Sequence, residues 1–131
     1  MSVNILVVDD SSVVRKMIVK MLHLAGLPIA EVYEAGNGLE GLSILNEYWV
    51  DVVFADINMP IMNGEEMIER IRQNPLWADL PLVVVSTEGS ETRVNHLRAM
   101  KARFIHKPFA PETIRSVVTE MLGLCHEQPA T

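Results

Sequence analysis

Five short apolar runs alternate along the chain with five segments whose apolar residues recur at helical spacing. The runs are rich in β-branched residues and predict buried strands at 4–8, 29–34, 50–55, 82–86 and 104–106. The segments that follow them predict amphipathic helices beginning near residues 11, 37, 64, 90 and 111. Strands and helices that alternate in this way form right-handed crossovers, so the pattern predicts a doubly wound three-layer α/β sandwich with a parallel five-stranded sheet.

Capping residues and apolar spacing define the expected inner faces of the helices. Ser11 or Ser12 is the expected N-cap of the first helix, and Gly26 ends it. The residues expected to face the sheet from this helix are Val14, Met17, Ile18, Met21 and Leu22. The second helix, after Asn37 and Gly38, is expected to carry Leu39, Leu42 and Leu45.

Length and composition limit the class of protein. The chain has 131 residues, and we expect one domain at 1–123, a short tail at 124–131 and no output domain.

No apolar stretch approaches the roughly 18 residues that a membrane span requires, so we expect a cytoplasmic protein with no membrane partner. The net charge is −6 and no basic tract occurs, which argues against direct nucleic-acid binding. The single cysteine, Cys125, excludes an internal disulfide.

Polar residues occur at the ends of four predicted strands. In chain order they are Asp9 and Asp10, Asp56, Ser86 and Thr87, and Lys107. Ligands of open parallel sheets bind beyond the carboxyl ends of the strands, so these side chains should converge there. Three carboxylates form a hard-oxygen site suited to Mg²⁺, and a hydroxyl and an ammonium beside them would bind a phosphoryl group. A carboxylate in such a site can accept that group as a mixed anhydride.

Each of these residues also has an ordinary structural explanation. Asp9 or Asp10 could cap the first helix, and Asp56 could form the turn before Pro60. Ser86 could belong to a turn, and Lys107 could be a solvated surface charge. Their joint occurrence at one edge of one sheet favours a shared functional site over these separate structural explanations.

Four segments, quoted in chain order, carry a family resemblance: VVDDSSVVRK, FADINMPIMNG, VVVSTE and FIHKPF. With these segments the chain resembles a response-regulator receiver domain of two-component signalling, over about residues 4–123. It is similar to the stand-alone, chemotaxis-regulator-like members. The resemblance implies a flavodoxin-like strand order of 2-1-3-4-5.

The resemblance also implies a role for each residue at the strand ends. Asp56 would be the phosphoacceptor. Mg²⁺, for which Mn²⁺ could substitute, would be bound by Asp10, Asp56 and the main-chain oxygen of Asn58, with Asp9 acting through water. Lys107 would contact the Asp56 carboxylate and then the phosphoryl group.

Further positions would control switching and the lifetime of the phosphoryl group. Ser86 would be the switching hydroxyl, with Thr87 beside it, and Phe104 would be the aromatic that rotates. Asn58 and Glu88 would tune loss of the phosphoryl group, and the Lys107–Pro108 peptide bond would be cis. Phe104 stands where chemotaxis members have Tyr, and its alternative explanation is a plain core aromatic.

Two further positions depart from the family pattern. Met100 replaces a common Gly at the end of the fourth helix, and Asn63-Gly64 replaces the usual Asp-Gly.

A receiver domain would take its phosphoryl group from a sensor histidine kinase or a phosphotransfer protein. It would bind a downstream protein through its fourth helix, fifth strand and fifth helix, and it would catalyse only its own phosphorylation and dephosphorylation. Six of the 11 lysine and arginine residues lie between Arg93 and Arg115, which suggests an acidic and apolar partner segment.

Two other functions remain open at this point. One is a Mg²⁺-dependent phosphohydrolase with an aspartate nucleophile, although such enzymes carry a DxD pattern and a cap that this chain lacks. The other is a receiver-like binding module that is never phosphorylated. The presence of Asp10, Asp56, Ser86 and Lys107 argues against the binding module.

Overall fold

The computed structural model describes residues 2–87 and 90–123. In chain order the elements are β1 (Val3–Val8), α1 (Ser12–Leu24), β2 (Ile29–Ala35), α2 (Gly38–Glu47), β3 (Val52–Ala55), α3 (Gly64–Gln73), the 3-10 helix η1 (Pro75–Trp77), β4 (Leu82–Ser86), α4 (Glu91–Ala99), β5 (Ala102–His106) and α5 (Pro111–Leu122). Within these ranges, every helix is too short or too polar to cross a membrane.

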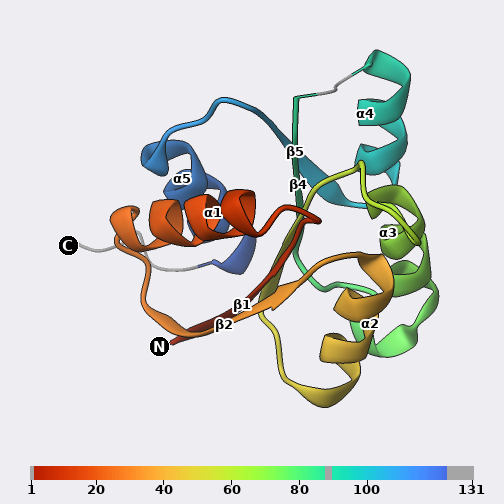
Figure 1. Ribbon diagram of the computed structural model, residues 1–131, viewed down its shortest axis with the longest axis horizontal. Coiled ribbons are helices and arrows are strands. Elements are labelled where there is room, and N and C mark those ends of the chain that lie inside the picture. Colours follow the sequence, from red (N-terminus) through yellow and green to blue (C-terminus); the bar gives the residue numbers. More distant parts are fainter. Residues whose placement is uncertain (1, 88–89, 124–131) are drawn as a thin grey trace.

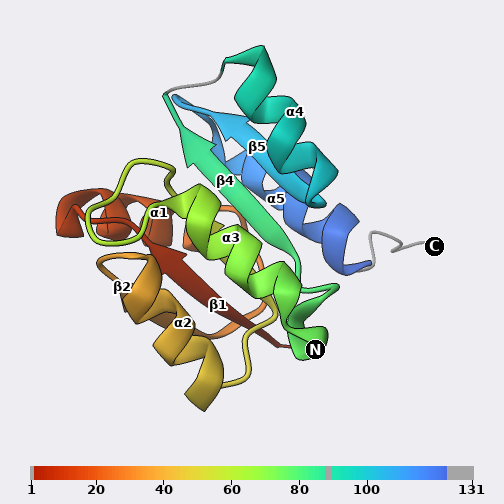
Figure 2. The same ribbon diagram turned by 90° about the vertical axis from the view of Figure 1, so that its right-hand side faces the viewer.

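The strands form one parallel sheet in the order β2-β1-β3-β4-β5. Helices α1 and α5 cover one face of this sheet, and α2, α3 and α4 cover the other (Figure 1). In the turned view, α2, α3 and α4 lie in front of the strands, and α1 and α5 lie behind them (Figure 2). The structure therefore confirms the predicted doubly wound α/β sandwich and its flavodoxin-like strand order.

The central strands are buried on both faces. Ile5 and Val7 of β1 pack into the core beneath α1 and α5, whereas Leu6 and Val8 pack into the core beneath α2, α3 and α4. All four side chains are fully buried, as are most of those in β3. A strand with a helical layer on each side needs apolar residues at every position, which explains the unbroken apolar runs in the sequence.

Two helical residues expected to face inward are exposed instead. Met17 of α1 is 49% exposed, while Ile18 and Leu22 are buried. At about 100° per residue, Met17 lies well away from the line through Ile18 and Leu22. Leu39 of α2 is 51% exposed because it lies about 120° around the helix from the buried Leu45.

Four strands differ from their expected bounds: β1 and β2 are each one residue longer, and β3 and β5 differ by two residues. β5 begins at Ala102, which pairs with Leu82 of β4, two residues before the expected start. Neither alanine nor arginine is among the residues that favour strands, so pairing with β4 decides the conformation of Ala102 and Arg103. β3 is shorter than expected and begins at Val52. The η1 turn was not predicted.

The connection from α4 to β5 contains a residue in the left-handed region. Lys101 has a φ of 63°, a conformation that costs an L-residue roughly 1–2 kcal/mol. The guanidinium of Arg72 donates hydrogen bonds to the carbonyl oxygens of Met100 (2.7 Å) and Lys101 (3.2 Å). Arg72 thus provides hydrogen-bond donors to carbonyl oxygens at the end of α4. The turn keeps its left-handed residue although that residue is not glycine.

We expect Lys101→Gly to raise the free energy of unfolding by about 1 kcal/mol, because glycine adopts positive φ without steric cost. The ion pair between Lys101 and Asp79 is exposed, so its loss should matter little. Lys101→Ala is the matched control, since it removes the same ion pair but keeps a Cβ. Urea denaturation measures the difference, and a Gly variant less stable than the Ala variant would contradict this explanation.

Candidate functional site

The strand register places Asp9 and Asp56 side by side at the carboxyl edge of the sheet. Val8 of β1 pairs with Ala55 of β3, so the residues that follow each of them lie at the same level. The amide of Asp56 donates a hydrogen bond to the carbonyl oxygen of Val8 (3.1 Å), which extends the ladder by one step. The two aspartates are brought together by parallel pairing of their own strands.

Lys107 reaches these two carboxylates from the end of β5. Its Nζ lies 3.8 Å from Oδ2 of Asp56 and 4.0 Å from Oδ2 of Asp9. The Lys107 side chain is only 19% exposed, and its amide donates to the carbonyl oxygen of Ser86 (3.0 Å). The Lys107–Pro108 peptide bond is cis. One ammonium group is thus positioned between two carboxylates.

Asp9 is the most deeply buried charged residue of this edge, at 2% exposure. Its Oδ1 accepts a hydrogen bond from the amide of Ser11 (2.9 Å). Its Oδ2 accepts no hydrogen bond from any part of the chain that the structure describes. Burial raises the pKa of Asp9 from 3.8 to about 6, repulsion by Asp56 and Asp10 adds to the rise, and the Ser11 amide and Lys107 oppose it.

The other predicted site residues that the structure describes differ in how far they are buried. Ser86 is buried at the end of β4, and Thr87 beside it is exposed. Asp10 and Asn58 are exposed at the edge, and Phe104 of β5 is half-buried against the core beneath α2, α3 and α4. Glu88 lies outside the described residues, as does Cys125.

Arg15 is a neighbour of the site that sequence reasoning missed. Its Nη1 donates to the carbonyl oxygen of Asp9 (2.6 Å), and its Nε pairs with Oε1 of Glu34 (2.8 Å). Helical side chains point toward the N-terminus of their helix, so a residue one turn into α1 can reach back to the preceding strand end. That direction is the signal by which Arg15 could have been found.

Gly64, the first residue of α3, allows the loop after Asp56 to fold back on itself. The Gly64 amide donates to the carbonyl oxygen of Ile57 (2.8 Å). A Cβ at position 64 would lie 2.2 Å from the carbonyl oxygen of Asp56, far closer than atoms can approach. Any side chain here would displace the peptide that carries Asp56, so only glycine fits at this position.

The donor atoms at this edge fit Mg²⁺. Among residues 2–87 and 90–123, no three His, Cys, Asp or Glu side chains form a group that could hold a metal ion by themselves. Mg²⁺ does not need such a group, because it usually binds one or two carboxylates and keeps several waters. Oδ2 of Asp9, buried close to Asp56, accepts no hydrogen bond from the described chain and lies 4.0 Å from Nζ of Lys107, too far for a hydrogen bond. The donor set is therefore suited to a hard divalent ion.

The fold and this edge together define a class: a flavodoxin-like domain with a lysine-paired acidic site at the carboxyl ends of its strands. The family model described as "Response regulator receiver domain" matches residues 5–119. The chain belongs to that family.

Comparison with individual proteins shows which members of the family this chain is similar to. The chain is 36% identical to a chemotaxis protein CheY homolog of Campylobacter jejuni, and the alignment covers 92% of both proteins. It is 33% identical to chemotaxis protein CheY1 of Helicobacter pylori, and that alignment covers 92% of this chain and 97% of the relative. The solved structure of chemotaxis protein CheY4 from Vibrio cholerae superposes with a TM-score of 0.81 at 32% identity, covering 93% of this chain and 100% of that one. The chain is a receiver domain homologous to chemotaxis response regulators of the CheY type.

The raised pKa of Asp9 predicts a pH-dependent stability. Its buried charge destabilises the folded protein above about pH 6, and the cost disappears as the pH falls toward 3.8 and the carboxyl is protonated in both states. In metal-free buffer at pH 8, Asp9→Asn should therefore be more stable than the wild type by roughly 2–3 kcal/mol, at about 1.4 kcal/mol per pKa unit. This difference should vanish near pH 4.

Chemical denaturation across this pH range, with a chelator present, measures the effect. Asp79→Asn is the matched control, because Asp79 is exposed, lies away from this edge and should show little change. A stability difference for Asp9→Asn that does not vary with pH would contradict the assignment.

Proposed function

We propose that this receiver domain accepts a phosphoryl group on Asp56 from the phosphohistidine of a sensor histidine kinase or a phosphotransfer protein, in a Mg²⁺-dependent reaction in the cytoplasm. Phosphorylation then changes its affinity for a downstream protein. The observation that supports this most is the position of Lys107, 3.8 Å from Asp56 and 4.0 Å from Asp9. This arrangement combines an acceptor with a cation that can stabilise phosphoryl oxygens.

The geometry distinguishes the two oxygens of Asp56. Oδ1 accepts a hydrogen bond from the amide of Ile57 (2.7 Å), which holds the carboxylate in place. Oδ2 faces Lys107, and we assign it as the nucleophile. It attacks phosphorus, an O–P bond forms, and the N–P bond of the donor histidine breaks. The bonding electrons remain on the imidazole nitrogen, which takes up a proton.

The metal would be held by Asp10, Asp56 and the main-chain oxygen of Asn58, with Asp9 contributing through water. When bound, Mg²⁺ would neutralise charge on the phosphoryl oxygens. Asp9 would then keep its carboxylate ionised, because a nearby cation lowers the pKa that burial raises. Lys107 would exchange its contact with Asp56 for one with a phosphoryl oxygen.

The switch would begin at the end of β4. Ser86, with Thr87 beside it, would bring a hydroxyl to the phosphoryl group. Phe104 lies on the neighbouring strand, opposite Val84 in the register, so a change at the end of β4 is one strand away from it. Rotation of Phe104 would remodel the face formed by α4, β5 and α5 by shifting a balance between two existing states.

The basic residues of that face are largely engaged within the molecule. Arg93 pairs with Glu65 (3.2 Å), Lys101 with Asp79 (3.3 Å) and Arg103 with Glu120 (2.7 Å). The local excess of basic residues in the sequence therefore overstates the charge presented to a partner. Apolar contacts and the state of Phe104 are the better basis for recognition of the downstream protein.

The phosphoryl group would be removed by water positioned between Asn58 and Glu88. The chain is thus a regulator that catalyses only its own phosphorylation and dephosphorylation. Two alternatives are a Mg²⁺-dependent phosphohydrolase with an aspartate nucleophile and a binding module that is never phosphorylated. Membership of the receiver family supports neither of them.

Intact-mass measurement after incubation with Mg²⁺ and a small acyl phosphate tests the proposal. We expect the addition of one phosphoryl group that is stable in acid, is lost in base, and is absent from Asp56→Asn. Asp79→Asn, at an exposed aspartate near the opposite edge, is the matched control and should be labelled normally. Repeated turnover of unrelated phosphate esters would indicate a hydrolase, and no addition from any donor, the cognate kinase included, would indicate a binding module.

Asp10→Asn should weaken Mg²⁺ binding and slow phosphorylation, because one hard anionic ligand is lost. The Mg²⁺ concentration that gives half-maximal labelling should rise, while Glu112→Gln, at an exposed glutamate of α5, should leave it unchanged. Labelling of Asp10→Asn at the wild-type rate and Mg²⁺ concentration would show that Asp10 is not a ligand.

A further inference from the structure

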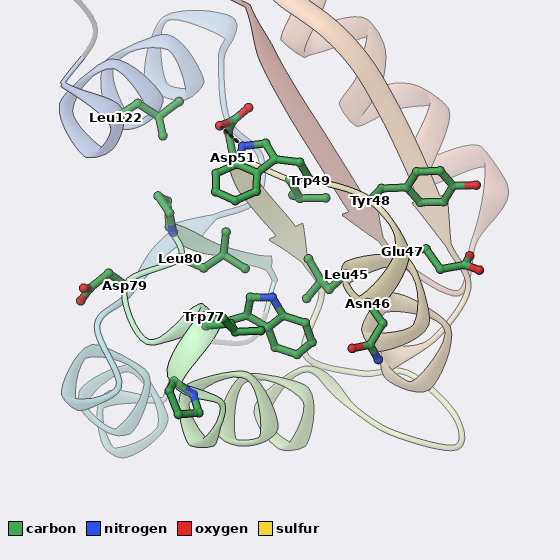
Figure 3. Close-up of a pocket in the computed structure, with 14 residues that line it drawn as sticks. Leu45, Asn46, Glu47, Tyr48, Trp49, Asp51, Trp77, Asp79, Leu80 and Leu122 are labelled. Atoms are coloured by element: carbon green, nitrogen blue, oxygen red, sulfur yellow. Dashed lines mark hydrogen bonds between the residues drawn. The ribbon is translucent and has the colours of Figure 1, made fainter.

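A cavity of about 560 Å³ opens at the amino-terminal edge of the sheet, opposite the edge that carries Asp56. Its walls come from the connection between α2 and β3, from η1 and the turn after it, and from Leu122 at the end of α5 (Figure 3). Within residues 2–87 and 90–123, no residue of the candidate phosphorylation site lines it. We call this cavity the α2–η1 pocket.

The pocket is built around both tryptophans of the chain. Trp49 is 77% exposed at its rim, and Leu76 of η1 is 86% exposed nearby. In the close-up, Trp49 and Trp77 lie on either side of Leu80 (Figure 3). Large apolar side chains exposed together around a hollow are typical of a binding surface, because they leave apolar area in contact with water.

Among the residues that the structure describes, every charged side chain that lines the pocket is a carboxylate: Glu47, Asp51 and Asp79. Asp51 is engaged, since its Oδ2 accepts from the amide of Asn4 (2.7 Å) and its Oδ1 from Nε1 of Trp49 (3.0 Å). Asp79 lies 3.3 Å from Nζ of Lys101, in an exposed pair. The lining therefore combines indole rings with negative charge, which favours a cationic occupant.

The walls are held in place before anything binds. Arg72 donates to the carbonyl oxygen of Trp77 (2.9 Å) with the same guanidinium that binds the end of α4. The hydrogen bond to Asp51 orients the Trp49 ring, and Tyr48 stacks on Tyr33 with ring centroids 4.7 Å apart. A preorganised surface loses little conformational entropy on binding, which favours affinity.

We propose that the α2–η1 pocket is a docking site for a protein segment that carries a bulky apolar or aromatic side chain flanked by lysine or arginine. The apolar side chain fills the hollow between the tryptophans, and the basic residues lie against Glu47 and Asp79. The exposed rim formed by Trp49 and Leu76 extends the contact beyond a small ligand. A second copy of the chain fits less well, because a symmetric contact would place the acidic lining against itself.

Selection from a phage-displayed library of random short peptides tests this inference, with counter-selection against the variant Trp49→Ala. The enriched peptides should share a large apolar residue flanked by lysine or arginine. Leu76→Asp should weaken their binding at least about tenfold, as loss of a central apolar contact does. Glu47→Lys should weaken it several-fold at low salt, and the difference from the wild type should shrink as the salt concentration rises, because salt screens the attraction that the wild type makes. Tryptophan fluorescence reports binding directly, because both tryptophans line the pocket.

Val13→Asp is the matched control, since Val13 of α1 is 74% exposed and does not line the pocket. It should bind the peptides like the wild type, and circular dichroism should show that all variants are folded. Failure to enrich any peptide, enrichment of acidic or uncharged peptides, or equal binding by Leu76→Asp would overturn the proposal. So would self-association that Leu76→Asp abolishes, because the occupant would then be a second copy. The test does not depend on phosphorylation of Asp56.

Discussion

One ammonium group shared by two carboxylates determines the properties of the site. Lys107 lies about equally far from Asp56 and Asp9, at 3.8 and 4.0 Å, and it cannot neutralise both. The charge of Asp9 is the costlier of the two, because Asp9 is buried and has one oxygen without a hydrogen-bond donor in the described structure. The folded domain thus carries an electrostatic cost that a cation at this edge would relieve.

The parallel sheet makes this concentration of charge unavoidable. Because β1 and β3 pair in register, the residues after Val8 and Ala55 must lie beside each other, whatever their charge. Gly64 then brings the start of α3 so close to the Asp56 peptide that no side chain fits between them. The backbone holds the two acidic residues together, and the surrounding side chains moderate the resulting repulsion.

The strand order could be predicted only from the resemblance to the family. The convergence of Asp9, Asp56 and Lys107 could be predicted because it follows from local pattern and from the geometry of parallel sheets. The contacts of Arg15 and Arg72 could not, because each depends on where a long side chain ends in three dimensions. The α2–η1 pocket was also missed. Its walls come from three segments that are far apart in the sequence, and neither tryptophan lies in a periodic pattern.

The two ends of the strands have different surroundings, and this separation has a consequence for assembly. A protein held at the α2–η1 pocket would leave the edge with Asp56 uncovered, so docking and phosphoryl transfer could occur on the same molecule at the same time. Such a tether would raise the effective concentration of the receiver near whatever its partner is attached to. The speed of signalling could then be tuned by residues that never contact the reacting atoms.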